Sequence, residues 1–200
     1  MSLPALPTPG DTPPGAAEDE RADTMSPPTM NAQPAADANR PEGFLRVARE
    51  LERLGHDRPP RFLDVAARTA QEAADALGVV VGQIAKSVIF RRREDDAAVL
   101  VIASGDRRVD ERKVERIVGR IGRADAEFVK ARTGFSIGGV SPVAHATPPI
   151  TLIDRDLFRF DLIWAAAGHP NGVFPLAPAD LERLTGAPVH DVAQPPAAQP

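Results

Sequence analysis

Lys86 is the one charged residue in an otherwise apolar stretch, residues 83–90 (QIAKSVIF). The chain has three lysines against 21 arginines, so an amine at this position suggests a use that a guanidinium would not serve. An ammonium contacts phosphate or carbonyl oxygens as a point charge, and its pKa shifts when it is partly buried. Two interpretations stay open here. Lys86 either faces a cleft or a partner, or lays its stem on the core while its head reaches solvent.

A second candidate for chemistry is the glycine-rich stretch at residues 133–142 (TGFSIGGVSP). Three glycines followed by Pro142 describe a backbone that needs unusual dihedral angles or the close approach of another group. The spacing Gly138-x-x-x-Pro142 predicts a tight loop whose amides and carbonyls point at a ligand, and a plain turn between strands is the alternative. The stretch is neither a Walker loop nor a dinucleotide fingerprint, and Ser141 lacks the context of a nucleophile elbow.

The absence of cysteine and the spacing of the histidines argue against several kinds of site. The chain has no cysteine, so it offers no disulfide, thiolate nucleophile or cysteine metal site. Its four histidines show no ligand spacing, so we expect neither a bound metal nor a cofactor. These histidines are His56, His145, His169 and His190.

The elements that must position these residues predict an α/β (α+β) domain with a mixed sheet. Lys86 lies near one end of a predicted hairpin, whose second strand at residues 97–104 shows no alternation and contains no charge, so we expect it to be buried on both faces. A capping box at Thr69 and Glu72 begins a helix that ends at Gly78. Further helices are expected at residues 42–54, 111–121 and 178–184, and further strands at 62–65, 127–130, 150–153, 162–167 and 173–176.

The acidic residues and prolines are concentrated at the start of the chain. Residues 1–41 hold two arginines and six acidic residues, which equals the whole formal net charge of −4, and nine of the 21 prolines. We expect this segment to be a disordered Pro/Ala-rich acidic tail, residues 42–193 to form the folded domain, and residues 194–200 to be a disordered tail. No membrane-spanning or secretory segment is indicated, so the expected compartment is the cytoplasm.

The middle of the chain is locally positive. Residues 86–132 hold 13 basic against nine acidic residues. Such an excess suits contact with phosphates, although arginine-rich faces are often simply solvated. No RNA-binding signature with interleaved aromatic and basic residues is present.

Five stretches, in this order, resemble the YbaK/EbsC family, the free-standing relatives of the editing domain inserted in bacterial prolyl-tRNA synthetases. They are TAQEAADALGV, QIAKSVIF, TGFSIGGVSPVAH, ITLIDRDL and AAGHPNGVFPLAPADLERLTGAPVHDV, and the resemblance covers residues 42–193. It implies a mixed β-sheet curled into a barrel-like body with flanking helices. By position, Lys86 matches the family's active-site lysine, Gly138, Gly139, Val140, Ser141 and Pro142 match its GxxxP loop, and Gly168 and His169 begin the turn that matches the third wall of its pocket.

The resemblance also implies a reaction and its partners. The expected activity is trans-editing hydrolysis of mischarged aminoacyl-tRNA, and the partners are the acceptor end of the tRNA and prolyl-tRNA synthetase. His169, Pro170, Asn171 and Val173 depart from the residues of the bacterial cysteinyl-tRNA deacylases. Those departures favour tRNA for proline that carries a small apolar residue such as alanine or 2-aminobutyrate.

The chemistry required of such a site is modest. An aminoacyl ester needs little activation, so the site has to position a water or a ribose hydroxyl and stabilise the developing oxyanion. Backbone groups of the glycine loop would do the second task, and Lys86 would hold the terminal phosphate or ribose. We therefore expect metal-free hydrolysis with no covalent intermediate. His169 is either a general base or a solvent-exposed histidine in a turn.

Two other functions remain open on the sequence. The chain could be a module that binds aminoacyl-tRNA or a synthetase without hydrolysis, or a hydrolase of a small free ester or amide. An intact Lys86 and glycine loop argue against the first. A basic surface beside the pocket would favour tRNA over a free metabolite, and a closed acidic rim would favour the metabolite.

Overall fold

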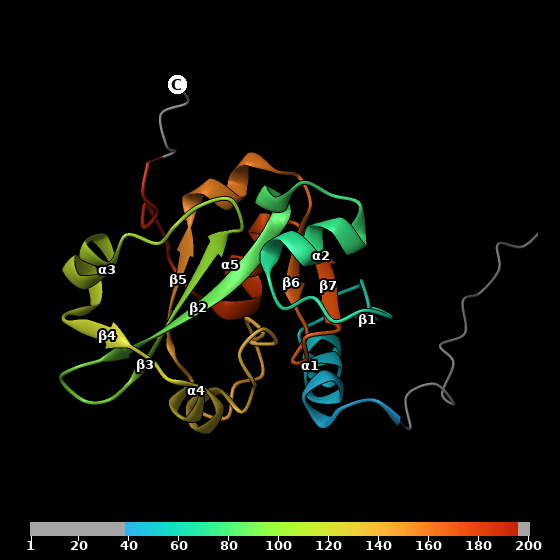
Figure 1. The fold of residues 1–200 in the computed structure, drawn as a ribbon, viewed down its shortest axis with the longest axis horizontal. Helices are drawn as coiled ribbons and strands as arrows, with labels where there is room; N and C mark the ends of the chain where they lie inside the picture. Colours follow the sequence, from blue (N-terminus) through green and yellow to red (C-terminus); the bar gives the residue numbers. More distant parts are fainter. Residues whose placement is uncertain (1–38, 196–200) are drawn as a thin grey trace, which may run out of the picture. The chain divides into compact units, whose positions relative to one another are not determined.

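The computed structural model describes residues 39–195 of the 200-residue chain (Figure 1). The tails expected at residues 1–41 and 194–200 therefore lie, apart from a few residues next to the domain, outside the described residues. The helices are α1 (Glu42–Arg53), α2 (Ala70–Leu77), α3 (Glu111–Val118), α4 (Ala126–Thr133) and α5 (Pro178–Thr185), with 3₁₀ helices η2 (Val81–Gln83) and η3 (Arg155–Arg159). No helix of residues 39–195 is both long enough and apolar enough to cross a bilayer.

Eight strands form one mixed sheet. They are β1 (Arg61–Phe62), β2 (Ile84–Arg92), β3 (Ala98–Ser104), β4 (Ile121–Arg123), β5 (Ile150–Asp154), β6 (Ile163–Ala166), β7 (Gly172–Leu176) and β8 (Val189–His190). The order is β1-β7-β6-β2-β3-β5-β8, and β4 also pairs with β2. The pairs β2–β6, β3–β5 and β5–β8 are parallel and the others antiparallel. The mixed sheet with flanking helices predicted from the sequence is confirmed.

The predicted hairpin is the longest pairing in the sheet. β2 and β3 pair antiparallel from Ala85 opposite Ser104 to Arg91 opposite Ala98. Ion pairs close the charged tip, with Arg91 2.6 Å from Asp96 and Arg92 2.5 Å from Asp95. Every residue of β3 is buried, as its uninterrupted apolar sequence predicted.

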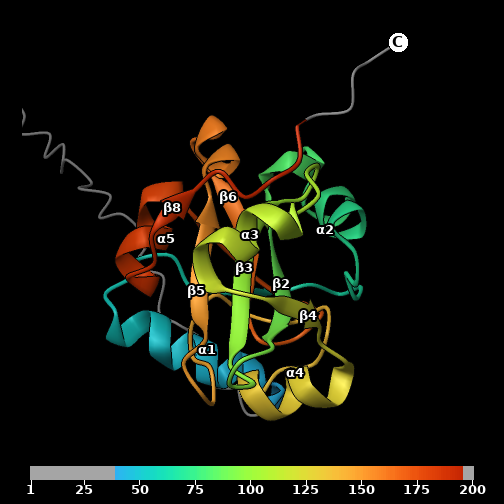
Figure 2. The ribbon, with the colours of Figure 1, turned by 90° about the vertical axis from the view of Figure 1, so that its left-hand side faces the viewer.

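Side chains that alternate along the strands divide the core between the two faces of the sheet. On one face, Ala85, Leu100 and Ile102 pack with α1 and α5. On the other face, Val99, Val101 and Phe90 pack with α3, which Figure 2 shows lying over β3.

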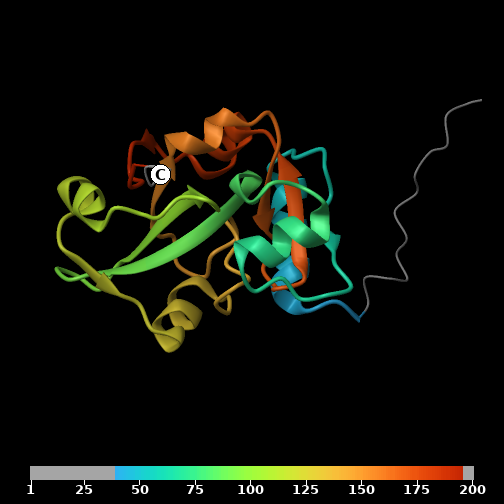
Figure 3. The same ribbon diagram turned by 45° about the horizontal axis from the view of Figure 1, so that its top comes forward.

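The second face holds another, separate patch under α2. There Ile84 and Trp164 pack against Ala73 and Ala74, and Figures 1 and 3 show α2 lying across β6 and β7. Ile84 and Phe90 both point to this face of β2, one under each patch. By the same alternation Lys86 and Val88 point into the gap between α2 and α3. The fold thus leaves one uncovered strip along β2, and Lys86 lies in it.

Local sequence explains where the helices begin and end. The capping box predicted for α2 is present, because the Thr69 hydroxyl accepts from the amide of Glu72 at 3.1 Å and the Glu72 carboxylate accepts from the amide of Thr69 at 3.1 Å. Gly78 ends α2 in the left-handed conformation with φ 67°. Asp110 caps α3 by accepting from the amides of Arg112 and Lys113 at 3.0 and 3.3 Å.

Two predicted elements were wrong. Residues 127–130 were expected to form a strand, yet they lie inside α4, because Asp125 caps that helix by accepting from the amide of Phe128 at 2.8 Å. The helix predicted to include Ile121 stops at Val118, because Gly119 turns the chain with φ 86°. Ile121 instead begins β4, a strand that was not predicted.

Candidate active site

The sheet is open along one short edge of its central strand. β3 pairs with one edge of β2, whereas the other edge pairs with β6 at Ile84 and Ala85 and with β4 from Phe90 to Arg92. Along this second edge, no described strand pairs with residues 86–89, which lie between the β6 and β4 pairings. Apart from the strand ladders, residues 86–89 make no backbone hydrogen bond with the described residues. An open edge of this kind presents hydrogen-bonding groups to a ligand.

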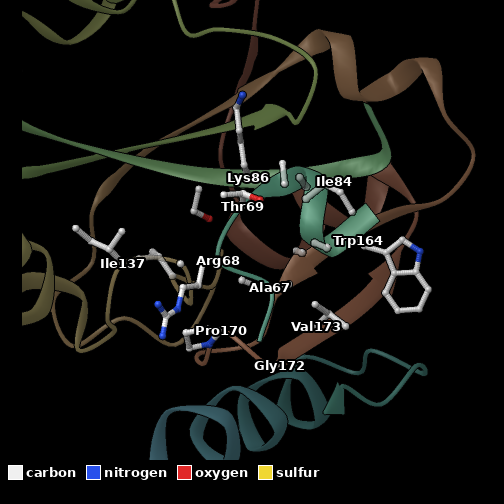
Figure 4. Close-up of a pocket in the computed structure, with 18 of the residues that line it drawn as sticks. Ala67, Arg68, Thr69, Ile84, Lys86, Ile137, Trp164, Pro170, Gly172 and Val173 are labelled. Atoms are coloured by element: carbon white, nitrogen blue, oxygen red, sulfur yellow. The ribbon is translucent and has the colours of Figure 1, made fainter. Parts of the chain in front are cut away.

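A cavity of about 240 Å³ lies at this opening (Figure 4). Most of its lining is apolar and many of the lining side chains are small, which suits a small apolar group. Residues 67–70 and Ala73, in and before α2, line it together with residues 84–88 of β2, Ile137, Gly138 and Val140 of the glycine loop, Trp164, Ala165 and Ala166 of β6, and Pro170, Gly172 and Val173. No Asp, Glu or His side chain belongs to this lining.

Lys86 lines the cavity with its stem and directs its amine outward. Figure 4 shows the side chain extending from β2 away from Ala67 and Pro170, with its nitrogen at the far end. The amine donates to the carbonyl of Gly105 at 3.2 Å and to that of Arg107. An ammonium has three N–H groups, so one remains for another acceptor. The stem of Lys86 therefore lies along the cavity, while its amine is held by the loop at residues 105–107, outside the cavity lining.

Partial burial lowers the pKa of Lys86, which is about half buried, and the positive charge of Arg108 lowers it further. The carboxylates of Asp106 and Asp154 act in the opposite direction.

The loop that holds this amine is braced by charged side chains behind it. Arg107 lies 2.6 Å from Asp156, and Arg159 lies 2.8 Å from Asp106. The Ser104 hydroxyl lies 2.6 Å from the carbonyl of Gly82. These contacts attach residues 104–107 to η3 and η2, so the two carbonyls that receive Lys86 are in fixed positions.

Only part of the glycine loop reaches the cavity. Gly138 has φ 88°, and it and Val140 line the cavity. Gly139 packs against the next loop, where a Cβ would lie 2.8 Å from Cα of His169. Ser141 is fully buried, and its carbonyl accepts from Nε2 of His145 at 2.7 Å. Pro142 belongs to a different hollow, beside Pro148 and Pro149.

The turn at residues 168–172 forms the third wall through its backbone more than through His169. Gly168 has φ 78° and lies against Gly43 of α1. The His169 ring stacks on Phe62 with centroids 5.2 Å apart, and its Nδ1 accepts from the amide of Asn171 at 3.1 Å. Burial lowers the pKa of His169, so the ring is neutral at neutral pH. His169 does not line the cavity, whereas Pro170 and Gly172 beside it do.

Several lining residues were not singled out from the sequence. Thr69 was assigned only to the helix cap, and Arg68, Ser87 and Trp164 were given no role at the site, although all four line the cavity. The guanidinium of Arg61 lies 5.3 Å from the centroid of the Trp164 ring. The one signal in the sequence was that Ser87 follows Lys86 and that Trp164 is the chain's single tryptophan.

Among residues 39–195, no three His, Cys, Asp or Glu side chains are grouped in a way that would hold a metal ion. The carboxylates of Asp106 and Asp154 act on Lys86 through charge, and Lys86 makes no direct ion pair with the described residues.

Comparisons with known proteins agree on one kind of domain. The family model described as aminoacyl-tRNA editing domain matches residues 64–184. A crystal structure described as a candidate trans-editing enzyme for prolyl-tRNA synthetase is 40% identical with a TM-score of 0.73, and the match covers 78% of this chain and 99% of that one.

Two curated proteins extend the comparison. The uncharacterized protein YwhH of Bacillus subtilis is 33% identical over 123 residues, which are 61% of this chain and 78% of YwhH. A proline–tRNA ligase of a Thermoanaerobacter strain is 28% identical over 94 residues, which are 45% of this chain and 16% of the ligase. The resemblance to the ligase is therefore confined to a small part of that enzyme.

Proposed function

This chain belongs to the aminoacyl-tRNA editing domain family, and we propose that it hydrolyses the ester bond of a mischarged aminoacyl-tRNA in the cavity beside Lys86. The observation that supports this most directly is the position of the cavity. It lies at the open edge of β2, between the stem of Lys86 and the glycine loop, so one ligand there meets a cation, free strand-edge groups and a tight backbone turn.

The lining of the cavity supports a small apolar aminoacyl side chain. Ala67, Ala73 and Ala165 leave room near Ile84 and Val173, and the volume is about 240 Å³. A side chain such as that of alanine or 2-aminobutyrate would be fully desolvated there, at about 0.8 kcal/mol of stabilisation for each buried methylene. A methylene difference alone gives only a roughly 10–200-fold preference, so the rejection of proline has to be measured directly.

The proposed chemistry uses water and no side-chain nucleophile. Ser141 is buried behind the loop, and the lining has no carboxylate or imidazole that could attack an ester. The open edge of β2 and the loop at Gly138 would hold the α-ammonium group and the developing oxyanion. The third N–H of Lys86 would donate to the terminal phosphate or the ribose and fix the ester over the cavity. In this proposal no metal or cofactor takes part.

The relation to prolyl-tRNA synthetase gives the proposed tRNA. Both the ligase match and the solved structure concern proline. We therefore propose tRNA for proline as the substrate, with the synthetase as a partner that supplies it.

The test is deacylation of tRNA for proline charged in turn with alanine, 2-aminobutyrate, cysteine, serine and proline. Wild-type protein should release a small non-cognate residue and leave proline attached. Lys86→Ala should lower kcat/KM about 10–100-fold, the loss expected when one charge-assisted hydrogen bond to the substrate is removed. Lys113→Ala is the matched control, because its amine is paired with Asp191 at 2.6 Å. Binding of charged tRNA without any release would overturn the enzyme proposal in favour of a binding module.

A further inference from the structure

A second hollow continues from the cavity along β2, and we call it the outer groove. It has a volume of about 490 Å³ and shares two lining residues with the cavity, Lys86 and Val88. Phe90, Arg108 and Arg123 belong to its lining, and Glu111 is its one acidic residue. Since Lys86 and Val88 are common to both, a ligand can extend from the cavity into the groove without leaving the protein surface.

Two cations of the outer groove, Arg108 and Arg123, have exposed side chains, and neither makes an ion pair with the described residues. Nearby arginines behave differently. Arg107 pairs with Asp156 at 2.6 Å, and Arg91 with Asp96 at 2.6 Å. The two arginines that line the groove therefore differ from these paired neighbours in having no carboxylate partner among the described residues.

The cations of the groove also lie close enough to repel one another. The loop that carries Arg108 is attached to Lys86 through the carbonyl of Arg107. The charge of Arg108 opposes that of Lys86, whereas Asp106 and Asp154 act in its favour from outside the groove lining, in which Glu111 is the one acidic residue. A bound anion would relieve this repulsion, which is the property expected of a phosphate site.

We propose that the outer groove binds the phosphodiester backbone of the unpaired RNA strand whose terminal ribose carries the aminoacyl group. This inference rests on the proposed function, since the cavity takes the aminoacyl end. The open edge of β2 spans four residues, about 13 Å at 3.3 Å per residue, which admits one extended strand. Arg108 and Arg123 contact successive phosphates, while Val88 and Phe90 offer an apolar floor to the sugars and bases.

The direct test measures binding of a short fluorescent single-stranded RNA ending in CCA at a series of salt concentrations. The variants are Arg108→Gln with Arg123→Gln, Glu111→Gln, and Arg58→Gln as a control. Arg58 is exposed, makes no ion pair with the described residues and is not part of the groove. Each lost phosphate contact on a single strand reduces the slope of log K against log salt by about 0.7, so the double variant should lose about 1.4.

Glu111→Gln should bind the RNA more tightly, because it removes the negative charge from the groove, and Arg58→Gln should match the wild type. Equal affinity and equal salt dependence in the wild type and the double variant would overturn the inference.

A kinetic test separates this inference from the proposed function. The substrates are charged tRNA and an aminoacyl-adenosine, which ends before the groove begins. Arg108→Gln with Arg123→Gln should lower kcat/KM for the tRNA at least 10-fold more than for the adenosine ester, mainly through KM. An equal effect on both substrates would overturn the groove assignment. If the wild type cleaves neither, the proposed function fails, and the RNA-binding measurement alone decides the groove.

Discussion

At the residue scale, His145 supports the glycine loop that lines the cavity. Its ring packs edge-on to Phe135 with centroids 5.9 Å apart, and its Nε2 donates to the carbonyl of Ser141 at 2.7 Å. Burial lowers the pKa of His145 to about 4, and the charge of Arg46 contributes to the lowering. The ring is therefore neutral at neutral pH and acts as a fixed donor to the glycine loop.

This pKa predicts an acid sensitivity of the fold. The unfolded chain takes up the proton near pH 6.5 and the folded chain only near 4, so the free energy of unfolding falls as the pH drops through this range. The difference corresponds to a loss of about 3 kcal/mol. His145→Gln keeps a donor but does not titrate, so urea denaturation between pH 7 and about 4.5 should show a smaller loss for the variant. An equal loss in both proteins would contradict the assignment.

Asp154 is another buried titratable residue close to Lys86. Its side chain is fully buried, and neither carboxylate oxygen makes a hydrogen bond of good geometry with the described residues, although the backbone groups of Asp156 and Val192 lie near enough to lower its pKa in part. Burial raises the pKa of Asp154, and the neighbouring charge of Asp156 adds to the effect. The carboxyl group is thus more easily accommodated as the neutral acid than as the anion.

A raised pKa gives the opposite pH dependence. The contribution of Asp154 to stability is complete below the unfolded pKa of 3.8 and is lost as the pH rises through the higher folded value. Asp154→Asn should therefore be more stable than the wild type near pH 7, and the advantage should disappear near pH 3. Thermal denaturation at both pH values measures it. An advantage that does not change with pH would show that charge is not the cause.

At the element scale, the cavity depends on two loops from distant parts of the chain that touch without a gap. Gly139 of the glycine loop meets the backbone of His169, with a built Cβ 2.8 Å from Cα and 2.9 Å from N of that residue. Backbone atoms cannot rotate away as a side-chain tip does. A methyl group at Gly139 must therefore push the two walls apart.

Gly139→Ala should lower the free energy of unfolding by about 1–3 kcal/mol and raise KM for the aminoacyl substrate. The matched control is Gly55→Ala. Gly55 has φ 68° and no atom near the position of a Cβ, so alanine there costs about 1 kcal/mol of backbone strain and leaves the cavity intact. Urea denaturation and deacylation kinetics on both variants separate the two effects. Equal KM values for both would contradict the role given to this contact.

Helices and strands that are determined by residues within or next to them could be predicted from the sequence. The capping residues Thr69 and Asp110 gave two helix starts, and the apolar run of β3 gave a buried strand. α4 was missed because Phe128 and Val129 look like a short strand, while its determinant is the Asp125 cap. β4 was missed because a three-residue strand depends on its pairing with β2.

At the scale of the whole molecule, the sequence pointed to the middle of the site more clearly than to its boundary. Lys86 stood out by its type and Gly138 by its spacing, and both line the cavity. Ala67, Ala73 and Trp164 could not be found in this way, because they become neighbours only when α2 packs over β6. The position of His169 was equally hidden, since its stacking on Phe62 brings together residues more than 100 positions apart in the chain.

The unpaired edge of β2 also affects whether two molecules of this protein can associate through their sheets. An unpaired strand edge is a template on which another extended chain can add, and sheet proteins commonly block such edges with a lysine. Here the exposed edge at residues 86–89 is short, is bounded by β6 and β4, and carries Lys86 at its start. The short length of this edge and the two strands that bound it leave little room for a strand of a second molecule to add there.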